Sequence, residues 1–110
     1  MSLPDIHKND VGTELIVAFV DETGAAIDIT TASPLQIILR KPDGTGATKT
    51  AVIDTVGTTG LAKYVTTKTG SPAVYDLDTV GDWEIQGYAV IGSDEWHTEV
   101  STFKVAGNLN

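Results

Sequence analysis

The feature that most constrains this chain is the alternation of side chains in residues 81–90, GDWEIQGYAV. Apolar or small residues occupy every second position from Trp83 onward, and polar residues or Tyr88 occupy the positions between them. Because successive side chains of a β-strand point to opposite faces, this pattern predicts a strand with one face in a core. Trp83 is the largest apolar side chain on that face, and burying a Trp removes about 150–250 Å² from water. We therefore expect the other strands to be arranged around Trp83.

Further short apolar segments are separated by turn signals such as Pro42-Asp-Gly44. They lie at residues 13–21, 27–30, 35–41, 48–55, 61–67 and 95–105. No segment carries apolar residues at i, i+3, i+4 and i+7 over three turns, so no long helix is expected. Short strands at this spacing predict an all-β fold, an antiparallel β-sandwich of about seven strands. The residues expected in its core are Leu15, Val17, Phe19, Ile37, Leu39, Trp83, Ile85, Phe103 and Val105.

The chain divides into a lead-in, one domain and a tail. Residues 1–10 are expected to be extended, and such an end is ordered only if it pairs with a sheet edge or a neighbouring subunit. The β domain spans residues 11–106, and residues 107–110 form a polar tail. Within the domain, residues 13–21 carry apolar side chains on both faces, which predicts a central strand covered on each side. Residues 68–76 are expected to form a longer connection before the Trp83 strand.

The charge of the chain excludes one class of partner. The formal net charge is −8, and residues 71–110 contain seven acids and one Lys. Nucleic-acid binding needs a basic surface to neutralise phosphates, so no nucleic-acid partner is expected. The sequence contains no cysteine, which excludes a disulfide scaffold and is compatible with assembly in a reducing cytoplasm. No apolar run approaches the length of a membrane span, and no signal peptide is expected, so we predict no membrane partner.

The residues that could carry chemistry do not form a convincing site. Asp76 and Asp78 match two places of a calcium loop, but Gly87 stands where a bidentate Glu belongs. A weak surface calcium site that uses Asp76, Asp78 or Asp82 stays open, beside the simpler interpretation that these carboxylates cap turn N–H groups. The two histidines, His7 and His97, do not make a metal site. We therefore predict no catalytic, cofactor-binding or metal-binding residues, and no enzyme.

The aromatic residues of the last hairpin allow two arrangements. If Phe103 points inward, strict alternation turns Trp96 outward, where it would join Tyr88 in an interface or ligand patch. A β-bulge near Val100 would instead bring both Trp96 and Phe103 into the core.

The order of these segments resembles that of a protein family. PDIHKNDVGT opens the chain and is followed by LIVAFVDETGAAIDIT, LQIILRKPDGT, LAKYVTT, DLDTVGDWEIQGYAV and WHTEVSTFKV. Together they resemble small tailed-phage proteins related to the N-terminal domain of baseplate upper proteins, over residues 4–107. The resemblance implies an immunoglobulin-like β-sandwich that serves as a building block of a virion. The family pattern carries no active site, so no catalytic residue is transferred to this chain.

The resemblance predicts a tail or baseplate component that is assembled in the bacterial cytoplasm and acts through subunit contacts. Its expected partners are other virion proteins and copies of itself. The residues expected at interfaces are Leu3, Ile6, His7, Lys8, Asp76, Asp78, Asp82, Tyr88, Trp96 and His97. Two alternatives stay open: a carbohydrate-binding module for a host-surface glycan, and a capsid decoration protein. No cofactor is expected.

Overall fold

The computed structural model describes residues 6–107, and these are all-β apart from one 3-10 turn at Gly57–Thr59. The described chain forms eleven strands, of which β9 is the longest with eleven residues. They are β1 (Ile6–His7), β2 (Glu14–Ala18), β3 (Leu35–Arg40), β4 (Gly46–Thr50), β5 (Val52–Ile53), β6 (Leu61–Val65), β7 (Lys68–Thr69), β8 (Val74–Tyr75), β9 (Gly81–Ile91), β10 (Asp94–His97) and β11 (Ser101–Ala106). None of the helices in residues 6–107 is long and apolar enough to span a membrane.

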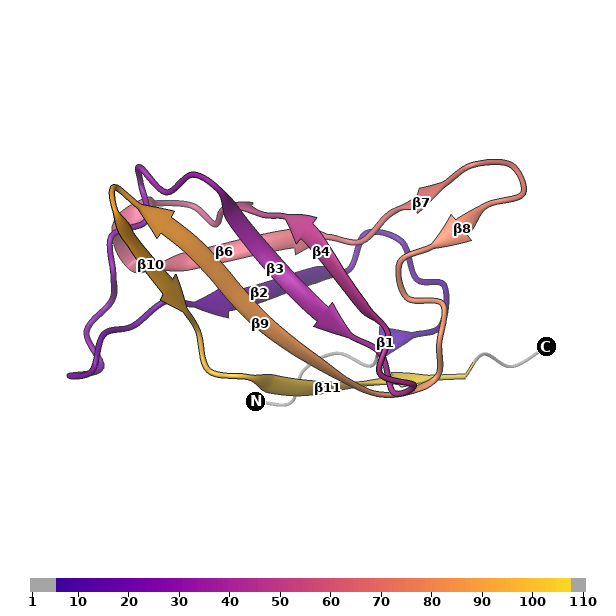
Figure 1. The fold of residues 1–110 in the computed structure, drawn as a ribbon. Helices are drawn as coiled ribbons and strands as arrows, with labels where there is room; N and C mark the ends of the chain where they lie inside the picture. Colours follow the sequence, from indigo (N-terminus) through magenta and orange to yellow (C-terminus); the bar gives the residue numbers. More distant parts are fainter. Residues whose placement is uncertain (1–5, 108–110) are drawn as a thin grey trace.

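The strands form two main sheets and one separate hairpin (Figure 1). The larger sheet has the order β1-β11-β9-β3-β4, with β10 pairing β9 on the same side as β11. This sheet is mixed, because β1 runs parallel to β11 while the other pairs are antiparallel. The smaller sheet has the order β2-β6-β5. The segment predicted as one strand at residues 48–55 divides at buried Ala51, where the chain passes from the larger sheet to the smaller one.

The core is built from the inward faces of both main sheets. In β9, Trp83, Ile85, Gly87 and Ala89 are buried, and the residues between them are half-buried or exposed, as the alternation predicts. Trp83 is completely buried, its ring stacks on Phe103 with centroids 5.8 Å apart, and its indole N–H donates to the Thr79 carbonyl at 2.9 Å. Of the residues expected in the core, Phe103 is half-buried and packs against the cluster, whereas the others are buried. Those others are Leu15, Val17, Phe19, Ile37, Leu39, Trp83, Ile85 and Val105.

The prediction of a central strand at residues 13–21 is wrong. β2 lies at the edge of the smaller sheet, and only its inward side chains, such as Leu15 and Val17, are buried. Ile16 is 49% exposed on the outer face, and Val20 beyond the strand is exposed as well. Apolar residues on both faces of a strand therefore do not guarantee that both faces are covered.

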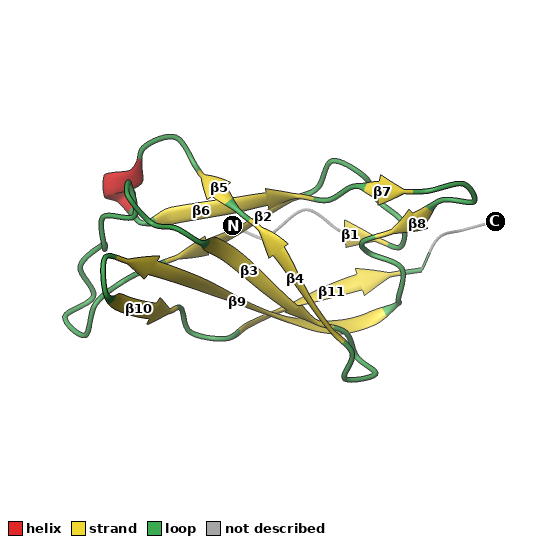
Figure 2. Cartoon of the chain, turned by 45° about the horizontal axis from the view of Figure 1, so that its top comes forward, coloured by secondary structure: helices red, strands yellow, loops and turns green. Residues whose placement is uncertain are grey.

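The connection predicted at residues 68–76 contains a hairpin of its own. β7 and β8 pair Lys68 with Tyr75 and Thr69 with Val74. In both ribbon views this hairpin projects from one end of the molecule, away from the two main sheets (Figures 1 and 2). We call the segment from Lys68 to Tyr75 the arm.

Candidate interaction surface

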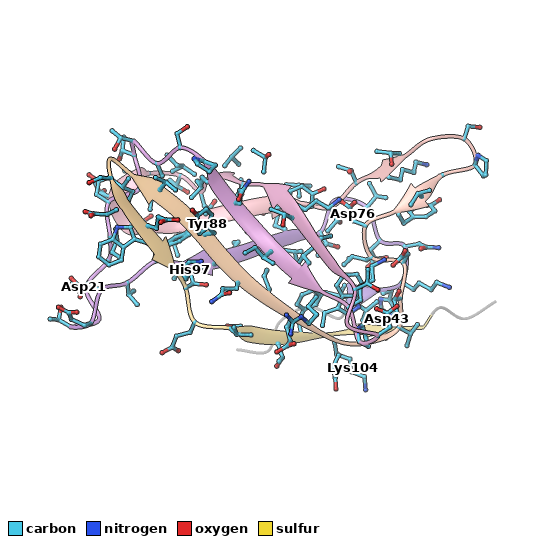
Figure 3. The ribbon with its side chains drawn as sticks, viewed as in Figure 1. Asp21, Asp43, Asp76, Tyr88, His97 and Lys104 are labelled. Carbon is cyan, nitrogen blue, oxygen red and sulfur yellow. The ribbon has the colours of Figure 1, made fainter. Side chains whose placement is uncertain are left out.

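The outer face of β9 and β10 presents an aromatic pair with a carboxylate. Tyr88 on β9 lies directly opposite His97 on β10, and their ring centroids are 4.9 Å apart. The Tyr88 hydroxyl donates a hydrogen bond of 2.5 Å to Oε1 of Glu95. This hydrogen bond to a carboxylate raises the pKa of Tyr88 above its ordinary value. Both predicted interface residues therefore lie on the same outer surface (Figure 3).

Trp96 does not join this outer surface. In the pairing of β10 with β9 it lies opposite buried Ala89, and in the pairing of β11 with β9 Phe103 lies opposite buried Trp83. Side chains directly opposite in an antiparallel pair share a face, so both rings are on the inward side. Trp96 is half-buried and packs against the core. The arrangement with a bulge is therefore the one the chain adopts, and the outward position of Trp96 expected from strict alternation is wrong.

The bulge is a single extra residue. Tyr88 faces His97 and Ile85 faces Ser101, so the two residues between them on β9 oppose three residues, 98–100, on the other strand. Thr98 is buried at this point, and its backbone N–H donates to the Gly87 carbonyl at 3.0 Å. Its Oγ1 accepts a hydrogen bond from the Gly87 N–H at 2.8 Å. These bonds satisfy the backbone groups that the interrupted ladder leaves without strand partners.

Asp76 is held at the root of the arm rather than presented to solvent. Its carboxylate accepts hydrogen bonds from the Tyr64 hydroxyl and from the Thr67 backbone N–H, the latter at 2.8 Å. It also forms an ion pair with Lys49, with Nζ 3.1 Å from Oδ1. Partial burial by itself would raise the pKa of Asp76, but the hydrogen bonds from Tyr64, Thr67 and Lys49 outweigh it and hold the pKa below its ordinary value. Figure 3 places Asp76 where the arm leaves the body.

Asp78 has a similar local role at the next corner. Lys41 places Nζ 2.8 Å from its Oδ1, and the Thr79 hydroxyl donates to the same oxygen at 2.9 Å. Partial burial opposes the charged form, and the Lys41 contact overcomes it, so the pKa of Asp78 is lowered. Asp82, by contrast, is exposed at the start of β9. Two of the three carboxylates expected at an interface therefore brace the chain itself.

The lead-in is engaged within its own chain where the structure describes it. Ile6 pairs with Val105 of β11 and packs against the core. The backbone N–H of His7 donates to the Asp10 carboxylate at 2.9 Å, and that of Lys8 donates to the Ala106 carbonyl at 2.8 Å. Leu3 lies outside the described residues. The expected sheet-edge pairing of the lead-in thus occurs with β11.

Within residues 6–107, no three His, Cys, Asp or Glu side chains are grouped closely enough to hold a metal ion. The described surface carries the exposed His97 ring beside half-buried Tyr88, exposed aliphatic side chains, and the projecting arm. The sequence did not predict two of these features. The first is the arm, whose Gly70-Ser-Pro72 turn between short β-branched segments could have indicated a hairpin. The second is the exposed outer face of β2, which alternation alone does not distinguish from a covered one.

Comparison of the chain with protein-family models, curated proteins and solved structures finds no match.

Proposed function

We propose that this chain is a non-enzymatic structural protein of a tailed-phage virion, in the tail or baseplate. In this role it works through contacts with copies of itself and with other virion proteins. The resemblance of residues 4–107 to phage proteins related to baseplate upper proteins supports this proposal. Its most specific segments are residues 37–44 and 77–88, which build strands, turns and the inward Trp83.

The proposal includes an immunoglobulin-like β-sandwich. Such folds place strands A, B, E and D in one sheet and C, F and G in the other. The order β2-β6-β5 fits B, E and D, and the order β11-β9-β3 fits G, F and C. The shared core between the two sheets supports the same assignment.

The single observation that carries the contact function is the arm. A two-stranded hairpin alone is marginally stable in water, yet this one is braced at its root by Asp76, which binds Thr67 just before β7. Val74 on the arm is 63% exposed. The Lys68 ammonium lies 5.9 Å from the centroid of the Tyr75 ring. A braced projection with an exposed aliphatic side chain and a cation suits contact with an acidic neighbour, and this chain carries a net charge of −8.

The test is incorporation into particles of the phage that encodes this chain. Val74→Asp places a charge on the arm, and Val56→Asp places the same charge at an exposed Val outside the arm. We expect Val74→Asp to lower the copies per particle at least about tenfold, because an unpaired charge in an interface costs roughly 2 kcal/mol or more. Val56→Asp should assemble as the unmodified chain does. Equal incorporation of both variants would exclude the arm as the contact.

The particle also separates the alternatives. A reconstruction with this chain at the tail or baseplate supports the proposal, whereas density on the head identifies a capsid decoration protein. The carbohydrate-binding alternative needs exposed aromatic rings that stack on a sugar. Trp96 packs against the core, so Tyr88 is the ring of this pair that remains on the outer face. Saturable sugar binding that Tyr88→Ala abolishes would still favour it over a purely structural role.

A further inference from the structure

We propose that β2 is a self-association edge, at which two copies of this chain pair their β2 strands antiparallel about a two-fold axis through Ile16. The inference deepens the proposed function by naming a partner, and it rests on that function only in requiring that the chain assembles. Three observations support it: the unpaired edge of β2, the aliphatic side chains on the outer face beside that edge, and the self-complementary sequence of the strand.

The edge is open among the described residues. β2 ends the order β2-β6-β5, so within residues 6–107 only one of its two sides is paired. The Phe19 N–H donates to the Gly60 carbonyl, and the Thr13 carbonyl accepts from Thr66, so residues 13 and 19 direct their backbone groups toward β6. Because these directions alternate along a strand, the N–H and C=O groups of residues 14, 16 and 18 point to the open side. Such a row is a template for another strand.

The outer face beside the edge is apolar. Ile16 lies opposite Lys63 of β6, and Val52 of β5 lies on the other side of Lys63. Val52 is 55% exposed, and Val65, at the end of β6, is exposed too. Lys63 is balanced by Glu14 at 3.7 Å and Asp54 at 3.6 Å. The row across this sheet is therefore aliphatic around one compensated cation, and edge-to-edge pairing would join it to the same row of the second copy, with Ile16 against Ile16.

The sequence of β2 is complementary to itself. Antiparallel pairing centred on Ile16 places it opposite Ile16 of the second copy and places Glu14 opposite Ala18. No like charges then face each other, and the three outward residues of each copy exchange about six backbone hydrogen bonds. β2, ELIVA, also lacks the Lys, Pro or bulge with which edge strands commonly prevent pairing. The contact is isologous, so it closes at two copies.

One pair of variants tests the edge by charge. Ile16→Lys would set two ammonium groups face to face on the axis, whereas Val52→Lys adds the same charge to the same sheet face two strands away. Both positions are exposed, so neither variant should disturb the core. Sedimentation equilibrium measures the dissociation constant of the dimer. We expect Ile16→Lys to raise this constant at least tenfold and Val52→Lys to change it less than threefold. Equal dimerisation of both variants would overturn the proposal.

A second pair of variants tests the register. The chain has no cysteine, so Ile16→Cys and Val52→Cys each introduce a single thiol. In the proposed dimer the two Cα atoms at position 16 are about 5.5 Å apart, whereas those at position 52 are five strand spacings or about 24 Å apart. A short bis-maleimide should therefore join the two copies of Ile16→Cys covalently and leave Val52→Cys without a cross-link. Equal cross-linking at both positions would contradict the register.

Two outcomes separate this inference from its rivals. A full-length chain that is monomeric, but dimerises once residues 1–5 are removed, would assign the edge to the chain's own N-terminal segment and overturn the proposal. Normal incorporation of Ile16→Lys into particles would remove β2 as the contact while leaving the proposed function intact.

Discussion

Thr98 Oγ1 accepts a hydrogen bond of 2.8 Å from the buried N–H of Gly87, and this bond holds the bulge that turns Trp96 toward the core. Without the extra residue, and with Phe103 still inward, Trp96 would lie on the outer face of the sheet, the face that Tyr88 occupies. The hydroxyl of one Thr thus bonds the neighbouring strand at the bulge that places an aromatic ring on the inward side of the sheet. The same hydroxyl donates to the Glu99 carbonyl at 3.0 Å, so both its donor and its acceptor capacity are used.

Thr98→Val should destabilise the fold by about 1–3 kcal/mol, because it keeps the side-chain volume but leaves the buried Gly87 N–H without its acceptor. Urea denaturation measures the change in unfolding free energy, and acrylamide quenching of Trp fluorescence reports whether Trp96 becomes more accessible. Thr102→Val, at an exposed position of β11, is the matched control and should stay within about 0.5 kcal/mol. A Thr98→Val variant as stable as this control would contradict the role of the hydroxyl.

Gly87→Ala should destabilise the fold by about 1–3 kcal/mol through overpacking. An added Cβ would lie 2.7 Å from Val17 Cγ2, 2.8 Å from Phe19 Cζ and 2.9 Å from Thr98 Cγ2, so these side chains would have to shift. At Gly46 the nearest atom to an added Cβ is the Leu39 carbonyl oxygen at 3.8 Å, so Gly46→Ala should be tolerated. Thermal unfolding compares the two variants. The Val17→Ala change should recover part of the loss in a double variant, and strictly additive effects would argue against contact across the sheets.

Asp76 should make stability depend on pH in the acid range. Its pKa is lowered in the folded chain from an ordinary value of 3.8, so the unfolded chain binds the proton more readily and stability falls as the pH drops below about 4. Asp76→Asn should lower stability at neutral pH by about 1–3 kcal/mol, because it loses charge-assisted hydrogen bonds. It should also flatten the pH dependence below pH 4, measured by urea denaturation between pH 2 and 7.

The flattening in Asp76→Asn should be partial. Asp78, whose pKa Lys41 lowers against partial burial, still contributes in that variant. Asp82→Asn, at an exposed position, is the control and should follow the unmodified chain at neutral pH. If the unfolding free energy of Asp76→Asn falls with decreasing pH as steeply as that of the unmodified chain, the contacts from Tyr64, Thr67 and Lys49 do not stabilise the carboxylate.

Period-two alternation predicted the strand at β9 and its buried face, because that face is read from side chains that are neighbours in sequence. It could not decide between the two positions of Trp96. A bulge adds one residue, and the apolar pattern of residues 95–105 accommodates it at several places. What fixes it is the meeting of Thr98 with Gly87, a contact between two strands.

The same dependence on contacts between distant segments explains why the exposed face of β2 and the roles of the acidic residues were not predicted. The alternation at β2 gives both faces correctly, but whether Ile16 is covered depends on a neighbour that the pattern does not contain. Closeness in sequence predicts a shared interface for the acidic residues at 76–82. Lys49 and Tyr64, which hold Asp76, lie in β4 and β6, and Lys41, which holds Asp78, directly follows β3. Sequence therefore predicts local faces, and tertiary contacts decide which of them remain for partners.

The mass of the purified chain in solution, measured across a wide range of concentration, tests the β2 contact most directly. We expect reversible association into a discrete species with an even number of copies, since the β2 contact joins chains in pairs. A chain that remains a monomer at every concentration, with and without residues 1–5, would contradict it.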